Sequence, residues 1–333
     1  MNPKVSVVIP TYNRAAKVPL GIQSVLEQTF SDLEVIVVDD GSSDGTGKIL
    51  AEMFGDRIRY YPQANQGVSV ARNKGIAEAR GEWVAFLDSD DQWEREKLEW
   101  QFKALERFGP QCGACYTDTR LMNHPETRTL FQMAEESYRH EETMGVNTDV
   151  LRLLVRPGGA GMVVCISSLL AWADAVKKTG GYDPKLGFYA DSEFMFRLAM
   201  LTGFCYVNRP LVWFDRSPDE NRHVGASKDW DRLEFILQEN KVRLEGFLQM
   251  TGVPPKVSKV IRQHLSTVYS GLANSHLETG NYGSAREAMS RAVRLNMTLN
   301  IAAKWVLTWV SPQLALRTVR KRQAVKEDPF PVL

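Results

Sequence analysis

Three features that would narrow the class of this protein are missing from its sequence. No apolar run reaches membrane-spanning length, because the uncharged stretch 158–173 falls short of the ~20 residues that a transmembrane helix needs. No signal peptide is expected, since the first four residues lead directly into a strand-like segment. Neither charge sign dominates: 41 basic and 40 acidic side chains argue against a nucleic-acid-binding protein that depends on an overall positive field. These absences favour a cytoplasmic protein that does not bind nucleic acid.

Cysteine is also scarce. Four thiols in 333 residues suit a reducing compartment better than a disulfide scaffold. Cys112 and Cys115 have the spacing of a redox or zinc motif, but no second Cys-x-x-Cys pair is present to complete a zinc site. We therefore interpret both residues as part of a buried strand.

The first hundred residues alternate between strand and helix patterns. Short apolar runs predict strands at 5–10, 33–40, 57–63 and 83–88. Four helices are predicted between and after these strands: at 19–28, from the cap candidates at 42–44 through Met53, at 68–79 and at 94–108. This alternation predicts an α/β fold with a mostly parallel sheet flanked by helices, in which ligands bind at the carboxyl ends of the strands.

The pattern weakens after Phe108 and becomes helical near the end of the chain. The predicted elements in between are strands at 112–118 and 162–168, helices at 172–179 and 191–201, and two strand-like pieces at 205–208 and 210–214. Beyond Ser227 the helical period continues to about Val310, and residues 272–295 resemble one tetratricopeptide helix pair. Because one such pair cannot bury its own apolar face, we expect a helical subdomain packed on the rest.

Three carboxylates, Asp88, Asp90 and Asp91, directly follow the apolar run 83–87. Like charges this close raise one another's pKa, so a compensating cation is expected. Mg²⁺ takes one or two carboxylates together with substrate phosphates, which suits Asp88 and Asp90 at a strand end. Asp91 can instead cap the helix that begins near Glu94. An Asp-x-Asp pair is common by chance, but at this place we interpret it as a metal–phosphate site.

A second acidic cluster, 39–44, follows the second predicted strand. Ser42 or Ser43 is the expected cap of the next helix. Asp40 can accept hydrogen bonds from a nucleobase or a ribose, as acidic residues do in dinucleotide-binding folds. No Gly-x-Gly-x-x-Gly follows the first strand, so we expect a metal rather than a glycine-rich loop to hold the phosphates.

Four ordered segments carry a resemblance to a known family. They are VSVVIPTYNRA (5–15), VIVVDDGSSDGT (35–46), NQGVSVARNKGIAEARGEWVAFLDSDDQW (65–93) and GGYDPKLGFYADSEFMFRLAMLTG (180–203). From residue 4 to about 227 the chain resembles glycosyltransferase family 2, inverting enzymes of the GT-A fold that use nucleotide sugars. The resemblance implies a GT-A domain over 1–227, with a nucleotide-binding half (1–108) and an acceptor half (109–227). Residues 228–333 would form the C-terminal helical subdomain.

The resemblance also implies nucleotide-binding residues. Pro10 and Tyr12 would form the wall against which the base lies, and Thr11 between them would also bind the nucleotide. Asp40 would hydrogen-bond the uracil or thymine edge, and Arg72 would lie near the diphosphate. The donor is therefore expected to be a nucleotide sugar, most simply a UDP-sugar.

The same resemblance assigns the metal site. Asp88, with Ser89, would contact the ribose or a metal-bound water, and Asp90 would bind Mg²⁺ or Mn²⁺ directly. His223, after the last predicted strand, would approach the metal or the diphosphate, although a lone histidine there is more often a surface or packing residue.

Asp191 falls where the family keeps its catalytic base, although Ala190 stands where a glutamate is usual. A helix N-cap is the other interpretation of this aspartate. An inverting transfer needs a carboxylate that takes the proton of the attacking hydroxyl, and a cation that stabilises the diphosphate leaving group. We therefore predict transfer of a sugar to a hydroxyl of a glycan or lipid-linked saccharide in cell-envelope polysaccharide biosynthesis. No Gln-x-x-Arg-Trp motif follows Asp191, which disfavours processive synthesis.

Other functions remain as alternatives. A phosphatase or a nucleotidyltransferase is the first alternative, since both use aspartates and Mg²⁺. The Asp-x-Asp-x-[Thr/Val] phosphatase form is disfavoured because Gln92 follows Asp91 and the cluster ends the fourth strand rather than the first. A catalytically silent nucleotide-sugar-binding or scaffolding protein is the second alternative, against which the presence of Asp90 and Asp191 argues.

The C-terminal region combines aromatic and basic residues. Trp305 and Trp309 precede a basic run that includes Arg317 and Arg320. Helices that lie on anionic membranes have this composition, but the two tryptophans can equally pack on the helical subdomain. We expect weak peripheral contact with the inner face of the cell membrane. The sequence does not indicate an oligomeric state, the sugar or the acceptor.

Overall fold

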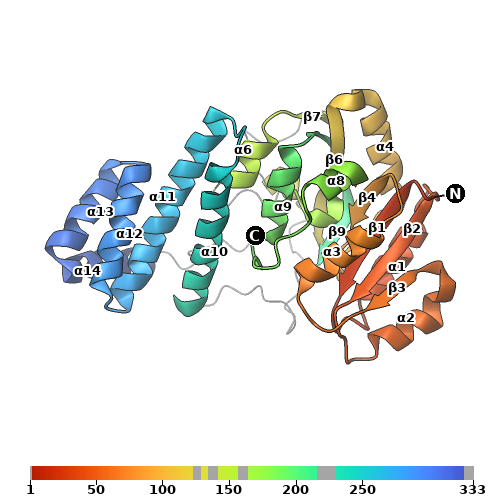
Figure 1. Cartoon of the computed structure of the whole chain (residues 1–333), viewed down its shortest axis with the longest axis horizontal. Helices are drawn as coiled ribbons and strands as arrows, with labels where there is room; N and C mark the ends of the chain where they lie inside the picture. The colour runs from red at the N-terminus through yellow and green to blue at the C-terminus, as the bar shows by residue number, and fades with distance from the viewer. Residues whose placement is uncertain (1, 123–128, 134–141, 157–163, 216–229, 326–333) are drawn as a thin grey trace. The chain divides into compact units, whose positions relative to one another are not determined.

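The computed structural model describes residues 2–122, 129–133, 142–156, 164–215 and 230–325 (Figure 1). The chain divides into two compact units. The first comprises Met1–Leu154 and Gly159–Arg222, and the second comprises Val155–Gly158 and His223–Leu333. Each predicted site residue that the structure describes belongs to the first unit.

Among the described residues, nine strands form one sheet in the first unit. They are β1 (Val5–Thr11), β2 (Leu33–Asp39), β3 (Arg59–Pro62), β4 (Trp83–Phe86), β5 (Gln92–Trp93), β6 (Cys112–Met122), β7 (Met144–Asn147), β8 (Leu170–Trp172) and β9 (Gly203–Asp215). Their order is β3-β2-β1-β4-β8-β6-β9-β5, and β7 pairs with β9 outside this path. The first four strands pair in parallel, whereas β8 runs antiparallel to both β4 and β6. The predicted α/β class is confirmed, and the sheet becomes mixed beyond β4.

Helices cover both faces of this sheet. Before residue 216 they are α1 (Val18–Leu26), α2 (Thr46–Phe54), α3 (Val68–Glu78), α4 (Lys97–Phe108), α5 (Leu130–Met133), α6 (Val150–Val155), α8 (Ala173–Lys178) and α9 (Ala190–Ala199), with 3₁₀ turns at Gly55–Arg57, Gly109–Gln111 and Ile166–Ser168. Every residue of β1 is buried, and Val7 shares a core with Ile22 of α1. On the opposite face α3 approaches β1 closely, since a Cβ on Gly75 would lie 2.3 Å from Val8 Cγ1.

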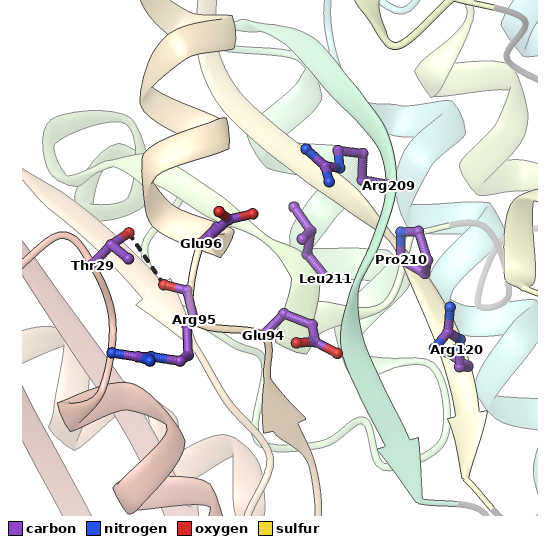
Figure 2. A pocket seen from close by; sticks show the side chains of 8 residues that line it. All are labelled: Thr29, Glu94, Arg95, Glu96, Arg120, Arg209, Pro210 and Leu211. Atoms are coloured by element: carbon purple, nitrogen blue, oxygen red, sulfur yellow. Dashed lines mark hydrogen bonds between the residues drawn. The ribbon is translucent and has the colours of Figure 1, made fainter.

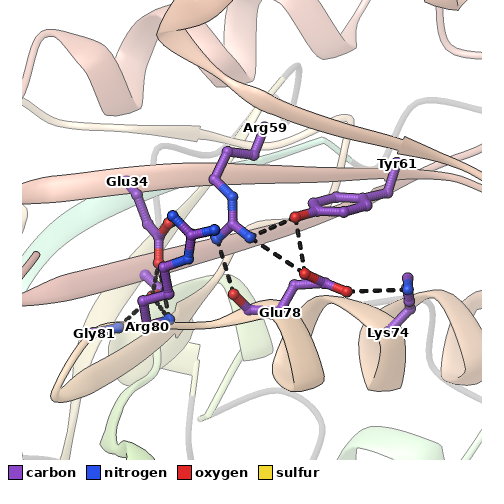
Figure 3. A network of polar contacts seen from close by, with 8 residues as sticks. Glu34, Arg59, Tyr61, Lys74, Glu78, Arg80 and Gly81 are labelled. Atoms are coloured by element: carbon purple, nitrogen blue, oxygen red, sulfur yellow. Dashed lines mark hydrogen bonds and ion pairs between the residues drawn. The ribbon is translucent and has the colours of Figure 1, made fainter. Parts of the chain in front are cut away.

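A polar network fastens the end of α3 to β2 and β3 (Figure 3). Arg59 contacts Glu34 at 2.7 Å and Glu78 at 3.2 Å. The Tyr61 hydroxyl donates to the same Glu78 carboxylate at 2.8 Å. Arg72 lies less than two turns earlier on α3, so this network helps to hold its helix in place.

The predicted helix caps are wrong. α2 follows Gly45, whose φ of 89° favours glycine, and no serine side chain caps the helix. Ser42 Oγ instead accepts a hydrogen bond from the Asn13 backbone N at 2.8 Å, and Asn13 Oδ1 accepts one from Ser43 N at 2.8 Å. These serines therefore join the loops that follow β1 and β2.

Two predicted strands also differ from the structure. Residues 166–168 of the strand predicted at 162–168 form a 3₁₀ turn, and the strand β8 begins only at Leu170. The two pieces predicted at 205–214 are one 13-residue strand, β9, because its pairing with β6 continues past Pro210 through an irregular register.

The second unit is helical where the structure describes it. Its helices are α10 (Trp230–Gln249), α11 (Pro255–Glu278), α12 (Tyr282–Leu295), α13 (Leu299–Val310) and α14 (Pro312–Val325). Leu277, Ala285, Ala315 and Val319 form a buried cluster that joins α11, α12 and α14. None of the described helices combines the length and the apolar character needed to cross a membrane.

Candidate active site

A buried arginine joins two of the predicted site carboxylates. Arg72 on α3 is 4% exposed; its Nη1 donates to Asp191 Oδ1 at 2.8 Å and its Nη2 to Asp88 Oδ1 at 2.6 Å. Asp88 follows β4, whereas Asp191 lies in the first turn of α9. Arg72 is 119 positions from Asp191 and 16 from Asp88 in the chain. The fold therefore brings Asp88 and Asp191, which are 103 positions apart, to one guanidinium.

The segment that carries Asp191 is fixed against α3 by one asparagine. The Asn73 side chain accepts from Tyr182 N at 2.7 Å and donates to Tyr182 O at 2.9 Å. Gly181 adopts a φ of 83°, and a Cβ there would lie 2.5 Å from Asn73 Oδ1, so no larger residue fits. The Tyr182 ring lies under the Arg72 guanidinium at 5.0 Å and stacks on Phe194 of α9 at 4.4 Å. Arg72 and Asp191 are thus oriented by the same local packing.

The Asp191 carboxyl is surrounded by protein although its side chain stays 38% exposed. This burial raises the pKa of Asp191, the Arg72 guanidinium opposes the rise, and the Asp88 charge adds to it. A carboxylate with a raised pKa binds a proton more readily than an ordinary aspartate. Asp191 therefore combines access from outside with the electrostatics of a proton acceptor.

Asp91 does not cap a helix. α4 begins after Glu96, while Asp91 is fully buried and accepts from Ser167 Oγ at 2.5 Å and from Asp215 N at 3.1 Å. Ser167 Oγ in turn accepts from Asp88 N at 3.0 Å. Burial raises the pKa of Asp91 well above its usual range, and the charges of its two neighbouring aspartates raise it further. Asp91 thus ties the aspartate segment to β9 and to the turn before β8.

Asp90 lies beside a cationic loop. Its carboxylate is 3.8 Å from Arg14 Nη2, and both side chains are 10% exposed. Lys17, three residues further along the chain, pairs with Asp215 at 2.8 Å. Neither basic residue was among the predicted site residues. Their signal in the sequence is their place, directly after the first strand at the edge where ligands are expected.

The predicted base-binding residues lie next to one another at the ends of β1 and β2. Pro10 and Thr11 are buried in β1, and the Tyr12 ring that follows is 41% exposed, which leaves surface for a planar base. Asp40 is 4% exposed and its oxygens accept from Gln63 Nε2 at 2.8 Å, Gln66 N at 2.9 Å and Gly67 N at 2.7 Å. Three of the roughly four acceptor positions of this carboxylate are thus occupied, which leaves about one for a nucleobase N–H.

The sequence of this chain matches those of known proteins. Residues 6–162 match the model of the family described as glycosyl transferase family 2. Over 230 residues the chain is 31% identical to the uncharacterized glycosyltransferase alr2836 of Nostoc sp.. The aligned part covers 67% of this chain and 68% of that protein. The chain belongs to glycosyltransferase family 2.

Other relatives carry the same description. The transferase is 40% identical to the putative teichuronic acid biosynthesis glycosyltransferase TuaG of Bacillus subtilis over 147 residues, 43% of this chain and 57% of that one. Among solved structures it resembles residues 1–349 of S. aureus TarS in complex with UDP, with a TM-score of 0.65, 17% identity, and coverage of 99% of this chain and 94% of TarS 1–349. At that identity the likeness shows a shared GT-A fold.

The carboxylates of this glycosyltransferase fit a metal ion only in part. Among the residues that the structure describes, no three His, Cys, Asp or Glu side chains form a group that could hold one. Mg²⁺ and similar ions do not need such a group where one or two carboxylates act together with substrate phosphates. Asp90, with Asp88 two residues before it, meets that smaller requirement. Ser89 is half-buried between them, and His223 lies outside the described residues.

Proposed function

We propose that this family 2 transferase is an inverting enzyme that uses a UDP-sugar, with Asp191 as the general base. The observation that carries the proposal is the Arg72 guanidinium, which hydrogen-bonds both Asp191 and Asp88. Through it a candidate base and the Asp-x-Asp segment lie within one side chain of each other. The solved complexes of TarS with UDP and with UDP-GlcNAc, which share the fold, support the choice of donor.

At the donor end, Tyr12 would stack on the base and Asp40 would accept from its edge. Asp90, beside Asp88, would hold Mg²⁺ or Mn²⁺, which supplies positive charge against the departing diphosphate. A relative fold, that of the mannosyltransferase PcManGT of Pyrobaculum calidifontis, has been solved with GDP-Man and Mn²⁺. Arg14, 3.8 Å from Asp90, would add a second positive group on the same side.

At the acceptor end, Asp191 would take the proton of the attacking hydroxyl. Arg72 would keep the carboxylate oriented through its hydrogen bond to Oδ1, which leaves Oδ2 for the hydroxyl. Since burial raises the pKa of Asp191, the acid limb of kcat/KM is expected above pH 3.8, the usual value for an aspartate.

The test is release of UDP from a panel of UDP-sugars in the presence of Mg²⁺ or Mn²⁺. Asp191→Asn should lower kcat by about 100-fold or more while donor affinity changes little, because a general base contributes about 10²–10⁴-fold. Asp90→Ala should abolish metal-dependent donor binding in calorimetry. Asp174→Asn, an exposed aspartate on α8, is the matched control and should retain activity. Full turnover by Asp191→Asn would refute the assignment of the base.

A non-catalytic role as a nucleotide-sugar-binding scaffold is the competing proposal. It expects binding of UDP-sugars with neither transfer nor hydrolysis, and no effect of Asp191→Asn on any measured property. The raised pKa and the partial exposure of Asp191 favour the enzymatic role, because a scaffold needs neither.

We further propose a glycan or lipid-linked saccharide as the acceptor, with weak contact of α13 to an anionic membrane. The apolar side chains of Leu299, Trp309 and Val310 are 92%, 50% and 79% exposed on this helix. Its one charged group, Lys304, bonds to Ser270, so the attraction to anionic lipid would come from the basic residues of α14, on which Arg317 is exposed. Co-sedimentation with anionic vesicles should fall in Trp305→Ala/Trp309→Ala and be absent with neutral vesicles. Equal sedimentation of both proteins would refute the contact.

A further inference from the structure

A cavity of about 510 Å³ lies beside β5 and β9 in the first unit (Figure 2). None of the site residues discussed above lines it. Glu94, Glu96 and Leu211 face the same space, and Arg120 and Arg209 stand around it. The cavity therefore joins charged groups of both signs that the proposed transfer reaction does not use.

One side of the cavity is built as a stack of three side chains. The Trp213 indole N–H donates to Glu94 Oε1 at 2.7 Å, which fixes the plane of the ring. The Arg120 guanidinium lies over that ring at 4.8 Å. A guanidinium stacked flat on an aromatic face keeps its N–H edges available for a ligand.

The second side repeats this arrangement with residues from other elements. The Trp100 indole N–H on α4 donates to Glu96 Oε2 at 3.4 Å, and the Arg209 guanidinium lies over the Trp100 ring at 4.2 Å. Two Glu–Trp–Arg units thus border the cavity, which their glutamates and arginines line, and in each unit the glutamate bonds to the indole rather than to the arginine.

Neither arginine forms an ion pair or a side-chain hydrogen bond in the part of the chain that the structure describes. Arg120 interacts electrostatically with Asp118, two residues before it on β6, but its Nε is buried without a hydrogen-bond partner. Leaving a buried donor unsatisfied costs free energy, and charge-assisted bonds to carboxylate or phosphate oxygens are the usual partners of guanidinium. The two units are therefore built to receive oxyanions.

We propose that this cavity binds an oligosaccharide that carries acidic groups, as an accessory site for the acceptor of the proposed transfer reaction. The guanidinia of Arg120 and Arg209 would hold its oxyanions, and the Glu94 and Glu96 carboxylates would accept from its hydroxyls. Arg120 pairs in register with Trp213, four residues beyond Arg209 on β9, so the two arginine positions lie about 13 Å apart along the strand. Such a separation suits an extended, repeatedly charged chain rather than one small anion.

The cavity is close enough to the aspartates for one acceptor to reach both. Glu94 is four residues from Asp90, and four extended residues span at most about 14 Å. β9 continues from Trp213 to Asp215, whose backbone N bonds to Asp91. An oligosaccharide bound in the cavity would therefore place neighbouring units near the proposed reaction centre. This step depends on the proposed function, whereas binding in the cavity does not.

Calorimetry on the full chain tests the site with three probes: a hexamer of galacturonic acid, a neutral hexamer of maltose type, and inorganic phosphate. The acidic hexamer should bind, and Arg120→Gln or Arg209→Gln should each raise its Kd by about tenfold or more, the range for losing a charge-assisted hydrogen bond. Arg209→Lys should give a smaller loss, because it keeps the charge but not the fork of donors. These variants should bind UDP as the unchanged protein does.

The matched control is Arg107→Gln, an exposed arginine on α4 that also stacks on an aromatic ring, Phe108 at 5.5 Å, but lies outside the cavity. It should leave binding unchanged. Equal affinity for the neutral hexamer, or phosphate binding as tightly as the acidic hexamer, would overturn the proposal, as would wild-type affinity in Arg120→Gln/Arg209→Gln. UDP release that persists while acidic-hexamer binding is absent would refute the accessory site alone.

Discussion

At the scale of single residues, the group with the least expected surroundings is Lys97. It has no accessible surface, its Nζ donates to Gln101 Oε1 at 2.9 Å, and it lies 3.8 Å above the Trp93 ring. The Trp93 indole N–H donates to the backbone O of Ser167, whose side-chain hydroxyl donates to Asp91. Burial without a carboxylate partner among the described residues lowers the pKa of Lys97 to about 7. A buried amine that is costly to protonate therefore lies next to the residues that hold the aspartate cluster.

Lys97→Met should stabilise the protein, and by more in acid than in alkali. The pKa of this lysine is about 7 in the folded chain against 10.5 unfolded, so the unfolded chain binds more protons between these values. The penalty is complete below pH 7 and disappears as the pH approaches 10.5; 3.5 pH units correspond to up to about 5 kcal/mol, reduced by the lost bond to Gln101. Urea unfolding at pH 6, 8 and 10 measures it. Lys48→Met, 80% exposed, should show little pH dependence, and an equal gain at all three pH values would contradict the argument.

Asp91 should tolerate amidation better than truncation. Asp91→Ala leaves the Ser167 hydroxyl and the Asp215 N–H without their acceptor, at a cost of at least about 2 kcal/mol. Asp91→Asn keeps the volume and one acceptor. Because the pKa of Asp91 is raised in the folded protein, its contribution to stability falls as the pH rises above 3.8, and Asn lacks this titration. The urea midpoint of Asp91→Asn, relative to that of the unchanged protein, should therefore be higher at pH 8 than at pH 5. Equal damage by Asn and Ala at both values would contradict this account.

The different environments of the three aspartates explain what residue types can predict. A strand that ends in Asp88-Ser89-Asp90-Asp91 marks the edge where ligands bind, and the structure places all three carboxylates there. Which of them is buried depends on Ser167 and Asp215, residues far along the chain whose approach no local pattern predicts. The Arg72 bridge to Asp191 is missed for the same reason.

At the scale of elements, two helical glycines allow a matched comparison. Gly75→Ala should gain about 1 kcal/mol from helix propensity but would bring a methyl group to 2.3 Å from Val8 Cγ1, and overpacking costs about 1–3 kcal/mol. We expect net destabilisation, together with weaker UDP binding because α3 carries Arg72. Gly246→Ala on α10 meets no atom within 4 Å and should stabilise by up to about 1 kcal/mol. Thermal denaturation and calorimetry measure both, and a stabilised Gly75→Ala would show that α3 can move away from β1.

The elements were predicted best where periodicity alone determines them. The α1 and α4 patterns and the four parallel strands are apolar runs with helical or strand spacing, and the structure confirms them. The caps were wrong because Ser42 and Asp91 hydrogen-bond to other loops instead of the helix that follows. The strand predicted at 162–168 was wrong because an apolar run of that length is compatible with several buried conformations.

At the scale of the whole molecule, the strand–helix alternation predicted the fold class, because a parallel sheet needs a crossover between successive strands. The mixed far half could not be predicted in this way. β8 has three residues and β5 two, too few to show a period. Their antiparallel pairing depends on strands far along the chain, β4 and β6 for β8 and β9 for β5. The two compact units have separate cores, and each core can be tested alone.

Leu277→Ala should lower the stability of the helical unit without removing donor binding from the other. Leu277 is 1% exposed in the cluster that joins α11, α12 and α14, and such truncations cost about 2–5 kcal/mol. Helical circular dichroism should then be lost at a lower temperature, while calorimetry at 25 °C still detects UDP. Val84→Ala, in the buried strand β4, is the counterpart. It should lower the temperature at which the first unit unfolds in the presence of UDP. Loss of UDP binding in Leu277→Ala while the helical signal is intact would mean that the donor site depends on the second unit.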